Sequence, residues 1–172
     1  MLEIAELSKE QVYTVMRELL YSFNYMWFLM EDWARQNCPE KAESEAFHQL
    51  SRDFGAYQAK RLEKIIETPD EGVERLVRFL RHSHRWVFED IELSRVSGKE
   101  LRMRTRNCTA QRAAKRWGME YYDCSQGGLW LRQGFFARIN PRARVERIFT
   151  PPQPPPEGIS GQVSCEWRIV LE

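Results

Sequence analysis

The residues of this sequence best suited to chemistry are the cysteines Cys108, Cys124 and Cys165. Asn107 is a typical N-cap residue and Gly118 a typical helix stop, so Cys108 is expected to begin a short helix. A helix N-terminus favours thiolate over thiol, which would make Cys108 a nucleophile or a metal ligand. Cys124 precedes a Gly-Gly pair that predicts a loop, and Cys165 is expected to face the core from the last strand.

The three cysteines are open to two interpretations. A helix start, a loop and the inner face of a strand can meet at one edge of a sheet, where Cys108, Cys124 and Cys165 could hold a metal ion. Their spacing, however, matches no close-paired zinc motif. A free cysteine also behaves as a small buried hydrophobe, so each one taken alone is more often part of a core. Cys38, which stands apart before Pro39, is expected to be structural.

Composition excludes several classes of protein. A chain of 172 residues fits a single domain over residues 1–172. With 26 Lys and Arg against 25 Asp and Glu, there is no excess of basic charge for nucleic acid or an anionic membrane. The N-terminal residues lack the pattern of a secretion signal, and the longest apolar run is too short to cross a bilayer. We therefore expect a cytoplasmic protein with thiols rather than disulfides. The sequence leaves the oligomeric state open.

Helical periodicity dominates the first part of the chain, residues 8–82. Ser8 and Gln11 form a capping-box pattern that opens a long helix with an apolar stripe. Asn24, Trp27 and Glu31 lie in its most apolar stretch, where polar groups need partners or a cavity. A second helix running to about residue 67 and a shorter third one complete this part, which we interpret as packing elements.

Residues 86–172 are expected to contain the sheet and the cysteines. An alternation of apolar residues predicts a hairpin over residues 91–105, a strand over 143–149 and a last strand over 163–171. In that last strand, Cys165 and Trp167 point one way. The fold class is therefore α+β: about three N-terminal helices packed on a small, mostly antiparallel sheet, with one further short helix between strands. Arg102, Arg104 and Arg106 line one strand face, which Glu89, Glu92 and Glu100 would neutralise.

Several short motifs resemble a known family. They are Asn107-Cys108-x-x-Gln111, Cys124, Phe136-Ala137-x-Ile139-x-Pro141, Pro151-Pro152 and Cys165-x-Trp167, with a weaker match on the first helix at Asn24-x-x-Trp27-Phe28 and Glu31. The segment is similar to an uncharacterised prokaryotic domain family related to L-2-amino-thiazoline-4-carboxylic acid hydrolase-like proteins. It is more distantly similar to vinyl-reductase-type small-molecule-binding domains.

The resemblance implies either opening of a thiazoline ring at a C–N or C–S bond, or a pocket beside a cysteine-ligated zinc. Cys108, Cys124 and Cys165 are the matching cysteines, and Gln111 and Trp167 are the matching neighbours. Arg147 and Thr150 stand where further cysteines are expected, which removes the thiols of a four-cysteine zinc site.

Three functional hypotheses follow. The favoured one is a small-molecule-binding protein with a pocket between the first helix and the sheet, lined by Asn24, Trp27 and Glu31 on one side and by Cys108, Gln111 and Cys124 on the other. The second is a hydrolase with Cys108 as nucleophile. Candidate bases for that reaction are Glu31, Asp32, His82, His84 and Asp123. The third is a scaffold or interaction protein whose cysteines are core.

Overall fold

The computed structural model describes residues 6–42 and 44–172, which divide into two compact units. One unit ends at Phe47, and the other comprises His48–Glu172. The pocket predicted between the first helix and the sheet would lie between the units, and it stays a prediction, as does the single domain. Residues 1–5, on which the expectation of no secretion signal partly rests, lie outside the described residues.

The first unit is built on the helix α1 (Lys9–Asn37), followed by the short α2 (Pro39–Ala42) and the start of α3 (Glu45–Leu62). The predicted capping box is confirmed: Gln11 N donates to Ser8 Oγ at 3.3 Å, and Ser8 N donates to Gln11 Oε1 at 2.8 Å. Pro39 is the first residue of α2, as its fixed φ and missing N–H favour. No helix in the described residues is long and apolar enough to cross a membrane.

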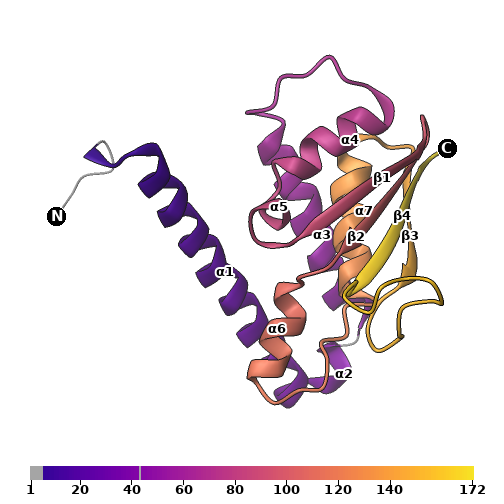
Figure 1. The fold of residues 1–172 in the computed structure, drawn as a ribbon. Helices are drawn as coiled ribbons and strands as arrows, with labels where there is room; N and C mark the ends of the chain where they lie inside the picture. The colour runs from indigo at the N-terminus through magenta and orange to yellow at the C-terminus, as the bar shows by residue number, and fades with distance from the viewer. Residues whose placement is uncertain (1–5, 43) are drawn as a thin grey trace. The chain divides into compact units, whose positions relative to one another are not determined.

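The second unit confirms an α+β fold. Its helices are α4 (Gly72–Arg81), α5 (His84–Phe88), α6 (Thr109–Arg116) and α7 (Gly127–Ile139), together with most of α3. Its strands are β1 (Ile91–Ser97), β2 (Glu100–Thr105), β3 (Ala143–Phe149) and β4 (Cys165–Leu171). The sheet is antiparallel throughout, in the order β1-β2-β4-β3. Helices α3, α4 and α7 lie on one face of this sheet (Figure 1).

The sequence interpretation was wrong at one helix. Gly127 and Gly128 were expected in a loop, but they are the first residues of α7. Glycine weakens a helix by about 1 kcal/mol relative to alanine, so local propensity opposes this element. Tertiary packing overrides it, because α7 runs backbone to backbone against α3. A Cβ atom on Gly55 would overlap the Leu131 carbonyl oxygen and lie 3.0 Å from Phe135 N.

A second glycine makes the same contact from the other helix. A Cβ atom on Gly134 of α7 would overlap the Arg52 carbonyl oxygen of α3 and lie 2.8 Å from its carbonyl carbon. Two glycines, one on each helix, thus allow the two backbones to touch. The core that this contact closes has Trp167, Phe79 and Phe136 as its largest fully buried side chains.

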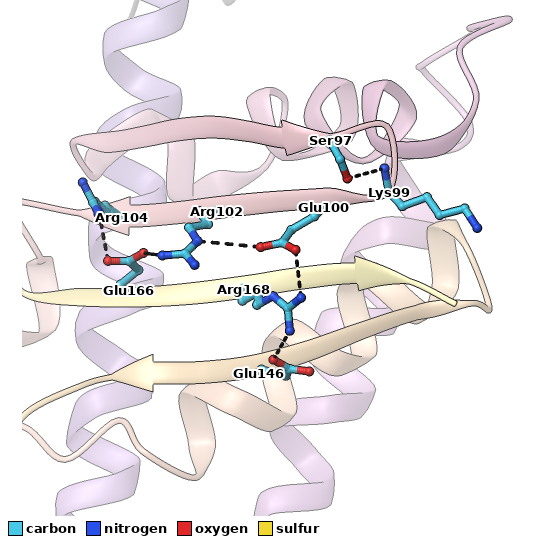
Figure 2. A network of polar contacts seen from close by, with 8 residues as sticks. All are labelled: Ser97, Lys99, Glu100, Arg102, Arg104, Glu146, Glu166 and Arg168. Carbon is cyan, nitrogen blue, oxygen red and sulfur yellow. Dashed lines mark hydrogen bonds and ion pairs between the residues drawn. The ribbon is translucent and has the colours of Figure 1, made fainter.

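The opposite face of the sheet carries a chain of ion pairs (Figure 2). Glu166 of β4 accepts from Arg102 Nη1 at 3.2 Å and from Arg104 Nε at 3.0 Å, both on β2. Arg168 then joins Glu100 at 2.8 Å to Glu146 at 2.9 Å, which links β2, β4 and β3. Glutamates therefore neutralise the arginines of this strand face, as predicted.

The partners in this network are only partly those expected. Glu92 pairs with Arg106 and Glu100 with Arg168, whereas Glu89 pairs with Arg85 on α5. The hydrogen bond from Arg168 holds the pKa of Glu100 below its usual value. The carboxylate missed from sequence is Glu166, which is fully buried although it points away from the helices.

The glycine contact between α3 and α7 predicts a severe effect of one methyl group. Gly55→Ala or Gly134→Ala should lower the free energy of unfolding by about 3 kcal/mol, because the helices must separate, which outweighs the better helix propensity of alanine. Urea denaturation measures the effect. Gly161→Ala is the control, since no atom lies within 4 Å of its added Cβ. Equal stability of all three variants would contradict this packing.

Glu166 should contribute more to stability than an exposed member of the same network. Glu166→Gln should lower the free energy of unfolding by about 2 kcal/mol, because two arginines lose a buried anionic partner. Glu146→Gln is the matched control: its side chain is 51% exposed, and the loss should stay below about 1 kcal/mol. Thermal unfolding of both variants in parallel tests this ranking, which a reversed order would refute.

Candidate functional site

The candidate site is organised around Trp167 on the helix-covered face of the sheet. This side chain is fully buried, and its Nε1 donates to Cys165 Sγ at 3.2 Å. Across the sheet its backbone partners are Met103 on β2 and Arg147 on β3. The prediction that Cys165 and Trp167 face the core together is therefore confirmed.

Arg132 of α7 lies over the indole of Trp167. Its Cζ is 4.2 Å from the ring centroid, a close cation–π contact, and its Nη1 donates to Gly128 O at 2.9 Å. Only 5% of the residue is exposed. Its Nε is also buried, and within the described part of the chain it has no hydrogen-bond partner. A buried guanidinium N–H without an acceptor is costly, so we take the surroundings of Arg132 as the candidate site.

The structure brings the three cysteines into the neighbourhood of Arg132. Cys108 is the N-cap of α6, Cys124 lies just before α7, and Cys165 begins β4. A Cβ atom on Gly128 would lie 3.2 Å from Arg132 Nη1, 3.3 Å from Cys124 Cβ and 3.4 Å from the Trp167 ring. The charge on Cys165 would act on both other thiols and on Arg132. Cys165 thus lies near enough to both other cysteines for its charge to affect them.

The thiols are not activated as expected. Burial, and then the charge of Glu89, raise the pKa of Cys108 to about 12, although it caps a helix. Burial also raises the pKa of Cys124 to about 12, and the Cys165 thiol acts in the same direction. The expectation of a lowered Cys108 pKa was therefore wrong: loss of solvent outweighs the helix dipole, whose influence fades within one turn.

Two further charged residues complete the cluster. Arg85 of α5 donates to Glu89 Oε2 at 3.2 Å, and the Glu89 side chain is only 4% exposed. Thr109 Oγ1 donates to the other carboxylate oxygen at 3.4 Å. Burial, and then Arg85, lower the pKa of Arg132 to about 10, so both guanidiniums are cationic at neutral pH. Glu89 thus pairs with Arg85, and its charge also acts on Arg132.

Arg85 and Arg132 also line a small cavity. Its other walls are Gln58, Leu80, Ser83, Met103, Leu131, Phe135 and Phe136. The cavity volume is about 10 Å³, which is room for about one water molecule or one small polar group. Beside it, burial lowers the pKa of His84 to about 3, so this imidazole is neutral at pH 7. Apolar walls with a few converging polar groups are typical of a ligand site.

The remaining residues predicted for the site have other surroundings. Gln111 forms two hydrogen bonds to the backbone of Tyr122, at 2.7 Å to its carbonyl and 3.1 Å from its N–H, so its amide holds the chain after α6. Asn24, Trp27 and Glu31 lie on α1 in the other unit, where Glu31 pairs with Arg35 at 3.4 Å. Their predicted role in binding stays a prediction.

The candidate bases are likewise dispersed. Asp123 Oδ1 accepts from Ser125 N at 2.8 Å in the turn before α7, and His82 contacts the Arg78 carbonyl. Asp32 on α1 accepts from Gln36 at 2.8 Å. Among residues 6–42 and 44–172, no three His, Cys, Asp or Glu side chains are arranged to hold a metal ion. Zinc at Cys108, Cys124 and Cys165 therefore has no support from this geometry and stays a prediction.

Sequence reasoning missed Arg132, the residue that connects the cavity with Trp167. Its signal in the sequence is a charged residue near the middle of the mostly apolar run Leu129–Ile139, whose other charge, Arg138, lies near its end. Once that run is recognised as a helix, Arg132 falls one turn after Gly128 on the same face. It was overlooked because the run had no assigned secondary structure.

Comparison with known proteins places the chain in a family without assigning it an activity. The chain belongs to a family of unknown function (DUF6125), whose model matches residues 5–171. No curated protein and no solved structure matches it significantly. The resemblance to thiazoline hydrolase-like and vinyl-reductase-type proteins therefore stays a prediction.

The raised thiol pKa values predict a loss of stability in alkali. Between the unfolded-chain pKa of ~8.5 and the folded value of about 12, the unfolded thiols of Cys108 and Cys124 release protons that the folded thiols keep. The free energy of unfolding should therefore fall as pH rises through this window. Urea denaturation from pH 7.5 to 10.5 measures this slope.

The double variant Cys108→Ala/Cys124→Ala isolates the contribution of the two thiols, because its slope should be flatter than that of the wild type. In native wild-type protein at pH 8, iodoacetamide should modify both cysteines at least ~100-fold more slowly than in the unfolded chain. Equal native and unfolded rates at Cys108 would contradict the raised pKa, and a faster native rate would show an activated thiol.

Proposed function

We propose that the protein is a small-molecule-binding protein whose ligand places one small polar group in the cavity beside Arg132. The observation that carries this proposal is the buried Arg132 Nε, which has no acceptor among the described residues, together with a largely apolar cavity that Arg132 lines. Burying a cation without a full set of partners lowers stability, and such an arrangement is expected where a ligand supplies the missing group. The site assigned here lies within the His48–Glu172 unit and needs no residue of α1.

The alternative of a cysteine-dependent hydrolase is less well supported. With a pKa of about 12, Cys108 is a neutral thiol at pH 7 and therefore a poor nucleophile. Glu89 is the acid whose charge acts on it, but this carboxylate is already engaged by Arg85 and Thr109. Hydrolysis would require Glu89 to exchange these partners for the thiol proton, a step that ligand binding does not need.

A substitution that fills the cavity tests the proposal. Leu131→Trp places a larger side chain in the cavity wall and should abolish ligand binding, whereas Leu50→Trp on the exposed surface of α3 should leave it unchanged. Saturation-transfer NMR with a set of charged and uncharged fragments detects binding, and native mass spectrometry detects a molecule retained on purification.

The expected result is binding to the wild type and to Leu50→Trp, with loss of binding in Leu131→Trp. Fragments that bind all three proteins equally would place the ligand elsewhere. A wild type that neither retains a molecule nor binds any fragment would refute the function.

A further inference from the structure

We infer that α1 is a dimerisation helix, whose exposed apolar face packs against the same face of a second copy of this chain. The helix belongs to the first unit, whereas the cavity of the proposed function lies in the second, so neither conclusion rests on the other. Three properties of α1 support a second copy as the partner: the period of its apolar residues, the distribution of its charges and the area of its exposed apolar surface.

The apolar residues of α1 repeat with the period of a coiled coil. The element is one continuous helix of 29 residues (Figure 1). Steps of four and three residues alternate without interruption along a stripe that we call the seam: Val12, Met16, Leu19, Phe23, Met26, Met30 and Trp33. A repeat of about 3.5 residues keeps such a stripe facing a partner helix when two helices wind around each other. Every residue of the seam is between 40% and 65% exposed.

Charged residues are confined to the side of α1 that faces away from the seam. Between residues 12 and 36 they are Arg17, Glu18, Glu31, Asp32 and Arg35. Their charges have partners within the helix itself, because Arg17 pairs with Glu18 and Arg35 pairs with Glu31. Phe28, the buried residue of α1, also lies on this side. The seam is therefore the side of the helix suited to packing against another apolar surface.

The positions next to the seam carry no charge between residues 12 and 36. They include Val15, Leu20, Trp27 and Leu29. Coiled coils that select a different chain use complementary charges at these flanking positions. The flanks of this seam lack the charges that would specify such a partner. An uncharged apolar stripe is complementary to itself across a twofold axis, which favours a second copy of the same helix.

The exposed apolar area of α1 is sufficient for a stable dimer. With about 100 Å² for each half-exposed large side chain, the seam and its neighbours Tyr13, Val15 and Leu29 present on the order of 1,000 Å². A specific interface buries roughly 800 Å² on each partner. Soluble monomers seldom expose a continuous apolar patch of more than a few hundred Å², so an uncovered seam of this size would be unusual.

The second unit exposes no apolar stripe of comparable length among its described residues. Eleven of the exposed large hydrophobic residues lie on α1, and six lie elsewhere: Leu50, Tyr57, Ile65, Val96, Tyr121 and Ile148. These six come from α3, β1, β3 and two connecting segments. Another α1 therefore matches the seam better than this unit does.

A lipid surface is also a poorer match for α1. Helices that lie on anionic membranes carry an excess of basic residues on their polar side. In α1 the basic residues are Lys9, Arg17 and Arg35, whereas the acidic residues are Glu10, Glu18, Glu31 and Asp32. Three positive charges against four negative ones give no attraction to anionic lipid.

Sedimentation of the full-length wild type tests the dimer directly. From about 1 to 200 µM, we expect a reversible shift from a species of 20.5 kDa to one of twice that mass, with a dissociation constant of about 10 µM or tighter. Oxidation by hydrogen peroxide then locates the interface. Met16, Met26 and Met30 should be oxidised more slowly as the protein concentration rises, whereas Met119, which lies outside the seam, should not change.

Charged substitutions assign the interface to the seam. Leu19→Lys and Met26→Lys should each weaken dimerisation at least about 100-fold, because each dimer would bury two unpaired ammonium groups. Lysine is a good helix former, so the helical content measured by circular dichroism should be retained. Thr14→Lys, on the other side of α1, and Ile65→Lys, an exposed apolar residue outside α1, are the matched controls and should dimerise like the wild type.

Four results would overturn the inference. The first is a wild type that stays monomeric over the whole concentration range. The second is a dimer that both seam variants retain, because another surface would then form it. The third is a monomer whose seam methionines are protected equally at every concentration, which would show that its own chain covers them. The fourth is a monomer that binds phosphatidylglycerol vesicles and loses this binding in Leu19→Lys, which would assign the seam to a membrane. The methionine protection is measured on the wild type, so the test holds even if a variant fails to fold.

Discussion

The close contact between α3 and α7 is the constraint on which the candidate site depends. Gly55 and Gly134 let the two backbones touch at Leu131 and Arg52, which fixes both the position and the rotation of α7. One face of α7 is then committed to α3. Gly128 and Arg132 lie one turn apart on the adjacent face and therefore point towards β4. Gly128 permits a close approach to Trp167, and Arg132 covers the ring of that residue. A buried cation at the sheet is thus a consequence of how two helices pack.

Buried charged side chains have different hydrogen-bond partners on the two faces of the sheet. On the face away from the helices, the buried Glu166 receives hydrogen bonds from both Arg102 and Arg104, and the network continues through Arg168 (Figure 2). On the helix-covered face, the buried Arg132 contacts the Trp167 ring and donates to the Gly128 carbonyl, while its Nε has no partner among the described residues. Because the same strand β4 supports both arrangements, the fold is able to supply a buried charge with partners.

Patterns of period two and local capping allowed much of the fold to be predicted. The capping box of α1, the hairpin β1–β2 and the inward face of β4 depend on neighbouring residues, and the structure confirms them. Helix α7 was missed because Gly127 and Gly128 favour a loop by local propensity. The contact with α3 that stabilises this helix involves residues far away in the sequence. For the site, the convergence of the cysteines followed from their elements, but Arg132 could not be assigned before α7. The direction of the Cys108 pKa shift was misjudged because burial depends on the whole fold.

The neighbours of Arg132 are suited to holding a cation without neutralising it. An aspartate in place of Cys124 would pair with the guanidinium and close the cluster, whereas a protonated thiol contributes only a weak acceptor. The indole face of Trp167 and the Gly128 carbonyl likewise attract the cation without carrying charge. Burial thus has two linked effects: it keeps the thiols of Cys108 and Cys124 neutral, and it leaves the charge of Arg132 available. Cys108 and Cys124, which first suggested a nucleophile or a metal, are therefore buried and uncharged thiols at neutral pH in this arrangement.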